Sequence, residues 1–359
     1  MLSPRTSQQG RVSCSPFQGR GGSRGGGDEA VSPDSLGVYL EAPSQEVRRV
    51  AFSGSGGTLF GIQIVNVLLT IITLGIYYFW GKTRVRAYTH SEMEFDGDRF
   101  AYHGTGKELL VGGLKAFGLF VVIVGGLGLL QFLTPGEAPK IAIGLLIYAV
   151  GLVLVPIATV GSRKYRLSRA SWRGIRFSFR GQTGEYMRIF IGGAVLTFVT
   201  LGLYYPFFYN NMWKYLIGNS YFGTKRFAFD GSGSDLFGRY LLAIVLSIFT
   251  LGLYWFWFSA ERNRYYWSHT AFESARFRST VRGGPLFRLT LGNVLLAVFT
   301  LGLAVPWVVV RNLRFVCTNV MLEGPVDFAA IQQDAQAASP VGESLADFLG
   351  LDIVGLVPS

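Results

Sequence analysis

The stretch Phe249-Thr250-Leu251-Gly252-Leu253-Tyr254-Trp255 contains a triplet, Thr-Leu-Gly, that occurs four times with an apolar residue directly after it. The other copies begin at Thr73, Thr200 and Thr300, and the last three copies begin 50 residues apart. A cation lies 14 residues after each of these three threonines, and an aromatic ring lies one residue later. Coincidences at several fixed offsets indicate an internal repeat, which has to be considered before any other feature.

The repeat extends into the segments that link one Thr-Leu-Gly to the next. An Arg-Phe pair lies 26 residues after three of the threonines, as at Arg226-Phe227, and a degenerate copy with Val150 in place of Thr keeps the pair at Arg176-Phe177. Aromatic and polar residues alternate here, and turn residues precede them, which predicts a short β-hairpin in each linking segment. The Gly-x-Gly that follows lacks the third glycine and the lysine of phosphate-binding loops, so we interpret it as a turn.

Composition places the chain among membrane proteins. It is 50% hydrophobic and only 15% charged, whereas soluble domains carry about a quarter charged residues. The apolar residues lie in blocks of about 20, the length of a membrane helix. We therefore predict an all-α polytopic membrane protein built from pseudo-repeats of about 50 residues, with short β-hairpins between the helices. The apolar blocks are 60–80, 109–133, 141–160, 186–209, 236–258 and 286–310.

Two topologies for these blocks remain open. If each block is one span, successive basic linking segments alternate between the two sides of the membrane, against the positive-inside rule. If instead Thr-Leu-Gly breaks a block into two helices, the chain returns to the side it came from. Pro206 and Pro306 lie six residues after a repeat threonine, where proline suits the first turn of a new helix. In that topology the turn contains Gly75, Gly202, Gly252 or Gly302.

The chain divides into three parts by composition. Residues 1–44 are rich in Gly, Ser and Arg and predict a disordered tail. Residues 45–325 form the predicted repeat-built transmembrane domain. Residues 326–359 contain five acids and no Lys or Arg, which predicts an acidic C-terminal tail.

The net charge of +11 indicates an anionic partner. The cations flank apolar blocks, where the edge of a bilayer must be, so we expect acidic lipid headgroups rather than nucleic acid as the partner. Nothing in the sequence suggests a catalytic set, a metal site or a cofactor, and no acid lies in the middle of a block, as ion-coupled carriers usually require. The candidate headgroup residues are Arg84, Arg86, Lys164, Lys214, Arg264 and Arg314.

The chain also resembles a known family. The segment from Thr73 to Arg84, the Gly104-Thr105-Gly106 segment and the run from Tyr165 to Phe177 together resemble the YjgN-like family of bacterial inner-membrane proteins, which is built around a domain of unknown function. The resemblance covers about residues 48–330. It implies a multi-pass protein of the bacterial inner membrane, but no activity.

The last unit departs from the family pattern, since Ala304 replaces a tyrosine and Val326-Asp327 replaces Arg-Phe. The sequence alone is compatible with two functions. The first is a non-enzymatic scaffold, or a lipid- or envelope-organising protein, with a basic aromatic cytoplasmic face. The alternative is a transporter or channel with a pathway between the pseudo-repeats. A homo-oligomer is compatible with both.

Overall fold

The computed structural model describes residues 46–334 and 341–349. The predicted disordered tail, residues 1–44, lies outside the described residues, as does the last part of the predicted acidic tail. The chain divides into two units, residues 1–44 and 45–359, and the description below concerns the second of these.

Each of five successive segments runs strand, helix, turn, helix, strand. We call these segments units 1 to 5, and they comprise residues 47–95, 98–172, 175–222, 225–272 and 275–323. The strands are β1 (Val47–Phe52), β2 (Met93–Phe95), β3 (Asp98–Tyr102), β4 (Ala170–Trp172), β5 (Ile175–Phe179), β6 (Ser220–Phe222), β7 (Lys225–Phe229), β8 (Thr270–Phe272), β9 (Ala275–Ser279) and β10 (Val320–Glu323).

The helices of units 1, 3, 4 and 5 form pairs of similar length, and those of unit 2 are longer. The pairs are α1 (Gly56–Ile72) with α2 (Tyr78–Ser91), α6 (Thr183–Val199) with α7 (Tyr205–Gly218), α8 (Gly233–Phe249) with α9 (Trp255–Ser268), and α10 (Gly283–Phe299) with α11 (Val305–Asn319). Unit 2 contains α3 (Gly106–Phe120), a π-helical turn (Val121–Gly125), α4 (Gly126–Leu133) and α5 (Glu137–Arg169). A last helix, α12 (Val341–Phe348), follows unit 5.

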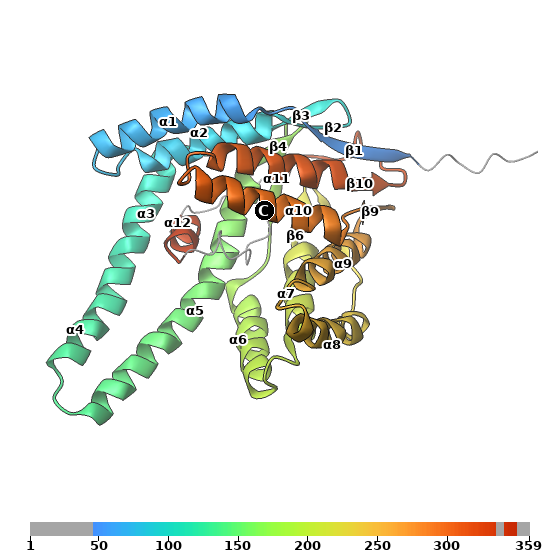
Figure 1. Ribbon diagram of the computed structural model, residues 1–359. Coiled ribbons are helices and arrows are strands. Elements are labelled where there is room, and N and C mark those ends of the chain that lie inside the picture. The colour runs from blue at the N-terminus through green and yellow to red at the C-terminus, as the bar shows by residue number, and fades with distance from the viewer. Residues whose placement is uncertain (1–45, 335–340, 350–359) are drawn as a thin grey trace, which may run out of the picture. The chain divides into compact units, whose positions relative to one another are not determined.

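The ten strands form one closed antiparallel barrel. Each unit pairs its own two strands, and β10 of unit 5 also pairs with β1, where Arg48 lies opposite Leu322. This second pairing closes the barrel. Tight hairpins join β2 to β3, β4 to β5, β6 to β7 and β8 to β9. Since all these hairpin turns lie at one end of the barrel, every helix pair leaves from the other end (Figure 1).

Apolar and mostly aromatic side chains fill the barrel. The phenylalanines of the Arg-Phe pairs pack here against residues of the neighbouring strands, and the Phe227 and Phe272 ring centroids are 4.7 Å apart. Each such side chain contributes about 1.5–3 kcal/mol on burial. The cluster comprises Val50, Phe95, Phe100, Trp172, Ile175, Phe177, Phe222, Phe227, Phe272, Ala275, Phe277, Leu322, Val326, Phe328 and Ile331.

Close contacts between a glycine and an aromatic ring join one unit to the next. A Cβ atom on Gly233 would lie 2.7 Å from the Cα of Phe207 in the preceding unit. Gly283 lies against Trp257 in the same way, and Gly56 of unit 1 lies against Trp307 of unit 5. The Gly-x-Gly turns therefore have a packing role, because only glycine allows the preceding helix to approach this closely.

The prediction of an all-α polytopic fold is wrong. A closed ten-stranded barrel holds the units together, and within the described ranges only residues 106–133 and 137–169 form helices long and apolar enough to cross a membrane. The other apolar blocks break at Thr-Leu-Gly into helices of 14 to 17 residues. At 1.5 Å per residue, a 17-residue helix spans about 25 Å, which is less than the roughly 30 Å of a bilayer core.

Of the described residues after β10, residues 326–334 cover one end of the barrel and residues 341–348 pack among the helices. Residues 326–334, the first part of the predicted acidic tail, pack at the end of the barrel where the hairpin turns lie: the Phe328 ring centroid is 4.9 Å from that of Trp172, and Thr224 N–H donates to the carbonyl of Gln332. Helix α12 then lies between α3 and α5 (Figure 1). Leu345 and Ala346 of α12 are buried there against Ala116 and Leu154.

Candidate functional site

The Thr-Leu-Gly triplets form the turns at the tips of the four shorter helix pairs. In the third copy Leu251 and Gly252 both have a positive φ, 49° and 84°, and Gly252 N–H donates to the carbonyl of Ser247 at 2.7 Å. Thr250 connects the two helices, since its hydroxyl donates to the carbonyl of Leu246 and accepts from the N–H of Tyr254. The other three copies have the same hydrogen bonds and positive φ values.

The leucine of each triplet is almost fully exposed. Leu74, Leu201 and Leu251 are each 94% exposed and Leu301 is 93% exposed. A leucine with a positive φ is strained by about 1–2 kcal/mol, and here it gains no contact inside the protein in return. Large apolar neighbours such as Phe249 and Phe299 are also exposed at these tips. The four tips thus present concentrated apolar surface, which marks an interaction site.

The helix pair of unit 2 has the same apolar character over a greater length. Within this pair, none of residues 117–153 is buried, and Phe132 and Tyr148 are more than 80% exposed. The turn between these helices contains Gly136, which has a φ of 90°. A pair of this length can cross a bilayer and return to the side from which it came.

The predicted headgroup cations of units 2 to 5 lie at the barrel end of the second helix of each pair. Arg264 donates to the carbonyl of Val281 at 3.1 Å, and Arg314 donates to the carbonyl of Gly54 at 3.1 Å, which ties unit 5 to unit 1. Within the part of the chain that the structure describes, Lys164 and Lys214 make no ion pair or hydrogen bond. The two arginines therefore have a structural role, whereas the two lysines are available to a ligand.

The two predicted headgroup arginines of unit 1 lie on α2, and the structure does not bring them together with the others as one site. The Arg84 guanidinium is 5.6 Å from the ring centroid of Tyr77, and Arg86 lies 6.0 Å from the ring centroid of Tyr102. The predicted cations are thus distributed around the ring of units at the base of the helices.

The tyrosines that follow Lys214 and Arg264 have a role that the sequence did not reveal. The Tyr265 hydroxyl accepts from the N–H of Ser232 and donates to its carbonyl, and Tyr215 does the same with Gln182. Burial raises the pKa of Tyr265 to about 12 and that of Tyr215 to about 12, so both phenols stay protonated at neutral pH. Each phenol fastens the start of one helix to the end of its partner.

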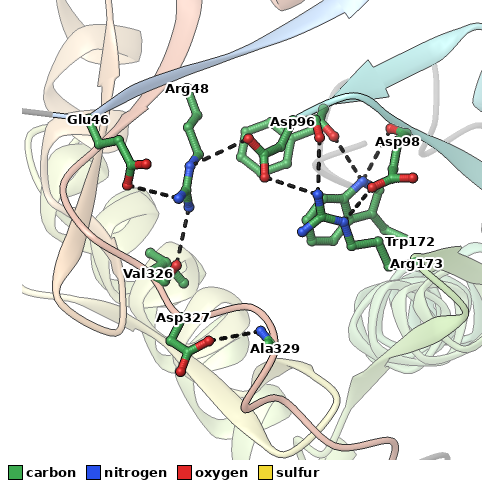
Figure 2. A network of polar contacts seen from close by, with 10 residues as sticks. Glu46, Arg48, Asp96, Asp98, Trp172, Arg173, Val326, Asp327 and Ala329 are labelled. Atoms are coloured by element: carbon green, nitrogen blue, oxygen red, sulfur yellow. Dashed lines mark hydrogen bonds and ion pairs between the residues drawn. The ribbon is translucent and has the colours of Figure 1, made fainter.

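The charged residues at the hairpin-turn end of the barrel neutralise one another (Figure 2). Arg173 contacts Asp96 at 3.1 Å and Asp98 at 2.5 Å, and its guanidinium lies 4.4 Å from the ring centroid of Trp172. Arg48 contacts Glu46 at 2.8 Å and Asp96 at 3.6 Å. These pairs are partly exposed and each contributes little stability. They do leave the cations of this network occupied, so the free lysines at the base of the helices are better candidates for anion binding.

Sequence reasoning did not include Arg262 among the candidate site residues, whereas the structure places it in the lining of a cavity among α7, α9, α10 and α11. Its position, 12 residues after the repeat threonine, is uncharged in the other four units, and that difference was the available signal. The residues at this offset are Val85, Ser162, Met212, Arg262 and Asn312.

Comparison with known proteins gives one family and a small set of relatives. The family described as "Bacterial protein of unknown function (DUF898)" matches residues 47–254, 226–275 and 244–348. Inner membrane protein YjgN of Salmonella typhimurium is 32% identical over 131 residues, which is 36% of this chain and 31% of the relative. Inner membrane protein YjgN of Escherichia coli K12 is 32% identical over 140 residues, 39% of this chain and 32% of the relative.

The alignment thus spans about a third of the length of these curated relatives. No solved structure matches the chain. The comparisons indicate a bacterial membrane protein whose activity is unknown.

Proposed function

Because the chain belongs to the DUF898 family of bacterial proteins of unknown function, we propose that it is an inner-membrane protein that organises lipids and catalyses no reaction. The relatives named inner membrane protein support this location. In this proposal the helix pair of unit 2 spans the bilayer, and the tips of the other four pairs enter it. The barrel stays on the cytoplasmic side, which the positive-inside rule favours for its basic strands.

The exposed leucines of the Thr-Leu-Gly turns are the observation that carries the proposal. In water, a residue that is strained and 94% exposed, as Leu251 is, lowers stability and gives nothing in return. In a bilayer the same side chain leaves water, which is worth about 1.5–3 kcal/mol for a leucine. Four such tips on the same side of one barrel supply about 6–12 kcal/mol of membrane attachment.

The turn also satisfies its own backbone, as insertion into lipid requires. An unpaired N–H or carbonyl costs several kcal/mol in hydrocarbon. At the third tip, Thr250 bonds one group on each helix, and the N–H groups of Gly252 and Leu253 bond carbonyls of the preceding residues. These bonds leave fewer backbone groups to desolvate when the tip enters lipid.

Tip insertion can be tested with an environment-sensitive fluorophore. A single cysteine at Leu251, in a chain whose Cys14 and Cys317 are replaced by Ser and Ala, is labelled and reconstituted in liposomes. We expect lipids with a nitroxide on the acyl chain to quench this fluorophore. The matched control is a cysteine at Thr224, an exposed residue of the β6–β7 turn, which should be quenched much less. Equal quenching at the two positions would refute the proposed insertion.

Headgroup binding requires a separate test. Each free cation near an anionic leaflet is worth about 1 kcal/mol. Replacing both Lys164 and Lys214 by Gln should therefore weaken anionic-lipid binding about 30-fold, as measured by lipid retention in native mass spectrometry. The control is Lys225→Gln, because Lys225 lies on the barrel and already contacts Glu273 at 3.4 Å. If the double variant retained as much anionic lipid as the wild type, these lysines would be topology signals only.

The transporter or channel alternative has less support. A pathway along the barrel axis would have to pass the cluster of rings inside the barrel. It would also have to displace Phe328, whose ring contacts those of Trp172, Phe95 and Phe272.

A further inference from the structure

A cavity of about 350 Å³ lies among α7, α9, α10 and α11, on the helix side of the barrel. Its volume is at the small end of the range for small-molecule sites. Apolar residues of α10 and α11, among them Leu286, Leu289 and Val316, form one part of the wall, and aromatic residues of α7 and α9 form another. Such a lining suits an apolar chain or ring, with specificity supplied by a few polar groups.

Arg262 is the one cation in the lining of this cavity. Its Nη1 donates to the hydroxyl of Tyr205 at 3.1 Å, and its guanidinium lies 4.9 Å from the ring centroid of Tyr209. Among the residues that the structure describes it has no carboxylate partner, since the neighbouring Glu261 pairs with Arg239 at 3.0 Å. A partly buried charge without a counter-charge is costly, and in a membrane protein it marks a functional site.

Two buried donors beside Arg262 lack acceptors. The indole N–H of Trp213 and the hydroxyl of Tyr266 have no hydrogen-bond partner in the described parts of the chain, and both residues line the cavity. Tyr266 is only 4% exposed. An unpaired buried polar group of this kind is rare in native proteins and calls for an explanation.

The repeat does not require this arrangement. The residues equivalent to Arg262 in the other units are uncharged, and the barrel and the turns of those units form without a cation there. An excess positive charge, two unused donors and an apolar wall thus meet at one place, where units 3, 4 and 5 adjoin. They match an oxyanion that is attached to an apolar chain.

We propose that this cavity binds a single-chain amphiphile whose head is one oxyanion, a carboxylate or a phosphate, held by Arg262. The apolar wall of α10 and α11 accommodates the chain. The site is separate from the tips and from the lysines at the helix bases. Its test uses the full chain in neutral detergent and therefore does not depend on tip insertion.

The test measures retention of defined amphiphiles by native mass spectrometry over a titration. We expect wild-type protein to retain one dodecanoate or one dodecyl phosphate per chain, and to retain neutral dodecanol much more weakly. Arg262→Met should weaken anion binding at least tenfold, and Arg262→Lys should restore part of it. The control Arg311→Met removes an exposed arginine of α11 that does not line the cavity, and it should change binding less than twofold.

Tyr266→Phe separates binding from folding. Removing an unpaired buried hydroxyl should leave thermal stability equal or higher, while anion affinity should fall several-fold because one donor is lost. Whichever anion binds more tightly identifies the chemistry of the head, carboxylate or phosphate. Equal anion retention by Arg262→Met and the wild type, or retention of dodecanol as strong as that of dodecanoate, would overturn the proposal.

Discussion

Three glycine-to-alanine substitutions in unit 4 distinguish a glycine needed for its positive φ, a glycine needed for close packing and a glycine with neither role. The substitution at the tip of the helix pair, Gly252→Ala, tests whether the Thr-Leu-Gly turn is strained. Gly252 has a φ of 84°, and a Cβ built on it would meet no atom within 4 Å. Gly252→Ala therefore introduces no clash, and its whole effect is conformational. Alanine in the left-handed region costs about 1–2 kcal/mol, so we expect destabilisation of that size.

The matched control is Gly238, in the exposed interior of α8, where an added Cβ also meets nothing within 4 Å. Here alanine favours the helix by about 0.8–1 kcal/mol, so Gly238→Ala should stabilise. The two substitutions thus have opposite signs and differ by about 2–3 kcal/mol. Gly233→Ala is the third case, because its Cβ would lie 2.7 Å from the Cα of Phe207, and overpacking of this kind costs about 1–3 kcal/mol.

Thermal unfolding in detergent, followed by circular dichroism, measures all three variants under one condition. The expected order of stability is Gly238→Ala, wild type, Gly252→Ala, with Gly233→Ala also below the wild type. If Gly252→Ala were as stable as Gly238→Ala, the tip would not impose the left-handed conformation, and the argument for a strained turn would fail.

Three further predictions follow from single contacts. Thr250→Val should destabilise the protein by about 1–3 kcal/mol, because the N–H of Tyr254 loses its acceptor. The same thermal assay measures this loss, and an unchanged melting temperature would show that water or lipid replaces the hydroxyl. Arg314→Gln should lower the free energy of unfolding by about 1 kcal/mol, because it removes the hydrogen bond to Gly54 that joins unit 5 to unit 1. The control Arg311→Gln should lower it less, and equal effects would mean that this hydrogen bond is not formed in solution. Phe328→Ala should lower the free energy of unfolding by about 3 kcal/mol, because it leaves a cavity among the aromatic rings inside the barrel. Chemical denaturation measures this change, and an unchanged midpoint would contradict the prediction.

The sequence predicted local structure well, because local structure depends on residues close together in the chain. The resemblance to the YjgN-like family is confirmed by the family and relatives that match. Turn residues such as Asp96-Gly97 predicted hairpins where the structure has β2 and β3. The broken form of the apolar blocks could not be chosen over a plain span, because an exposed Thr-Leu-Gly turn and a tolerated glycine in a helix have the same composition.

The barrel was missed because it depends on pairs that lie far apart in the chain. Arg48 pairs with Leu322 across the closing seam, and strands of three to six residues carry too little pattern to identify a partner. The segment around Phe328 was interpreted as part of an acidic tail because its acids dominated the composition. A closer signal was available, since Val326, Phe328 and Ile331 are large apolar residues separated only by small and polar ones. The structure has these three packed into the barrel.

The pairing of β10 with β1 determines when this protein can finish folding. The closing strand is the last of the ten, so during synthesis the first four units and β9 are complete while β1 and β9 still expose unpaired backbone groups. Contacts between residues so distant in sequence form slowly, and a chain stopped before β10 would retain two open edges able to pair with another chain. Quality control of this protein therefore depends on its final unit, and early termination should produce aggregation rather than a smaller working ring.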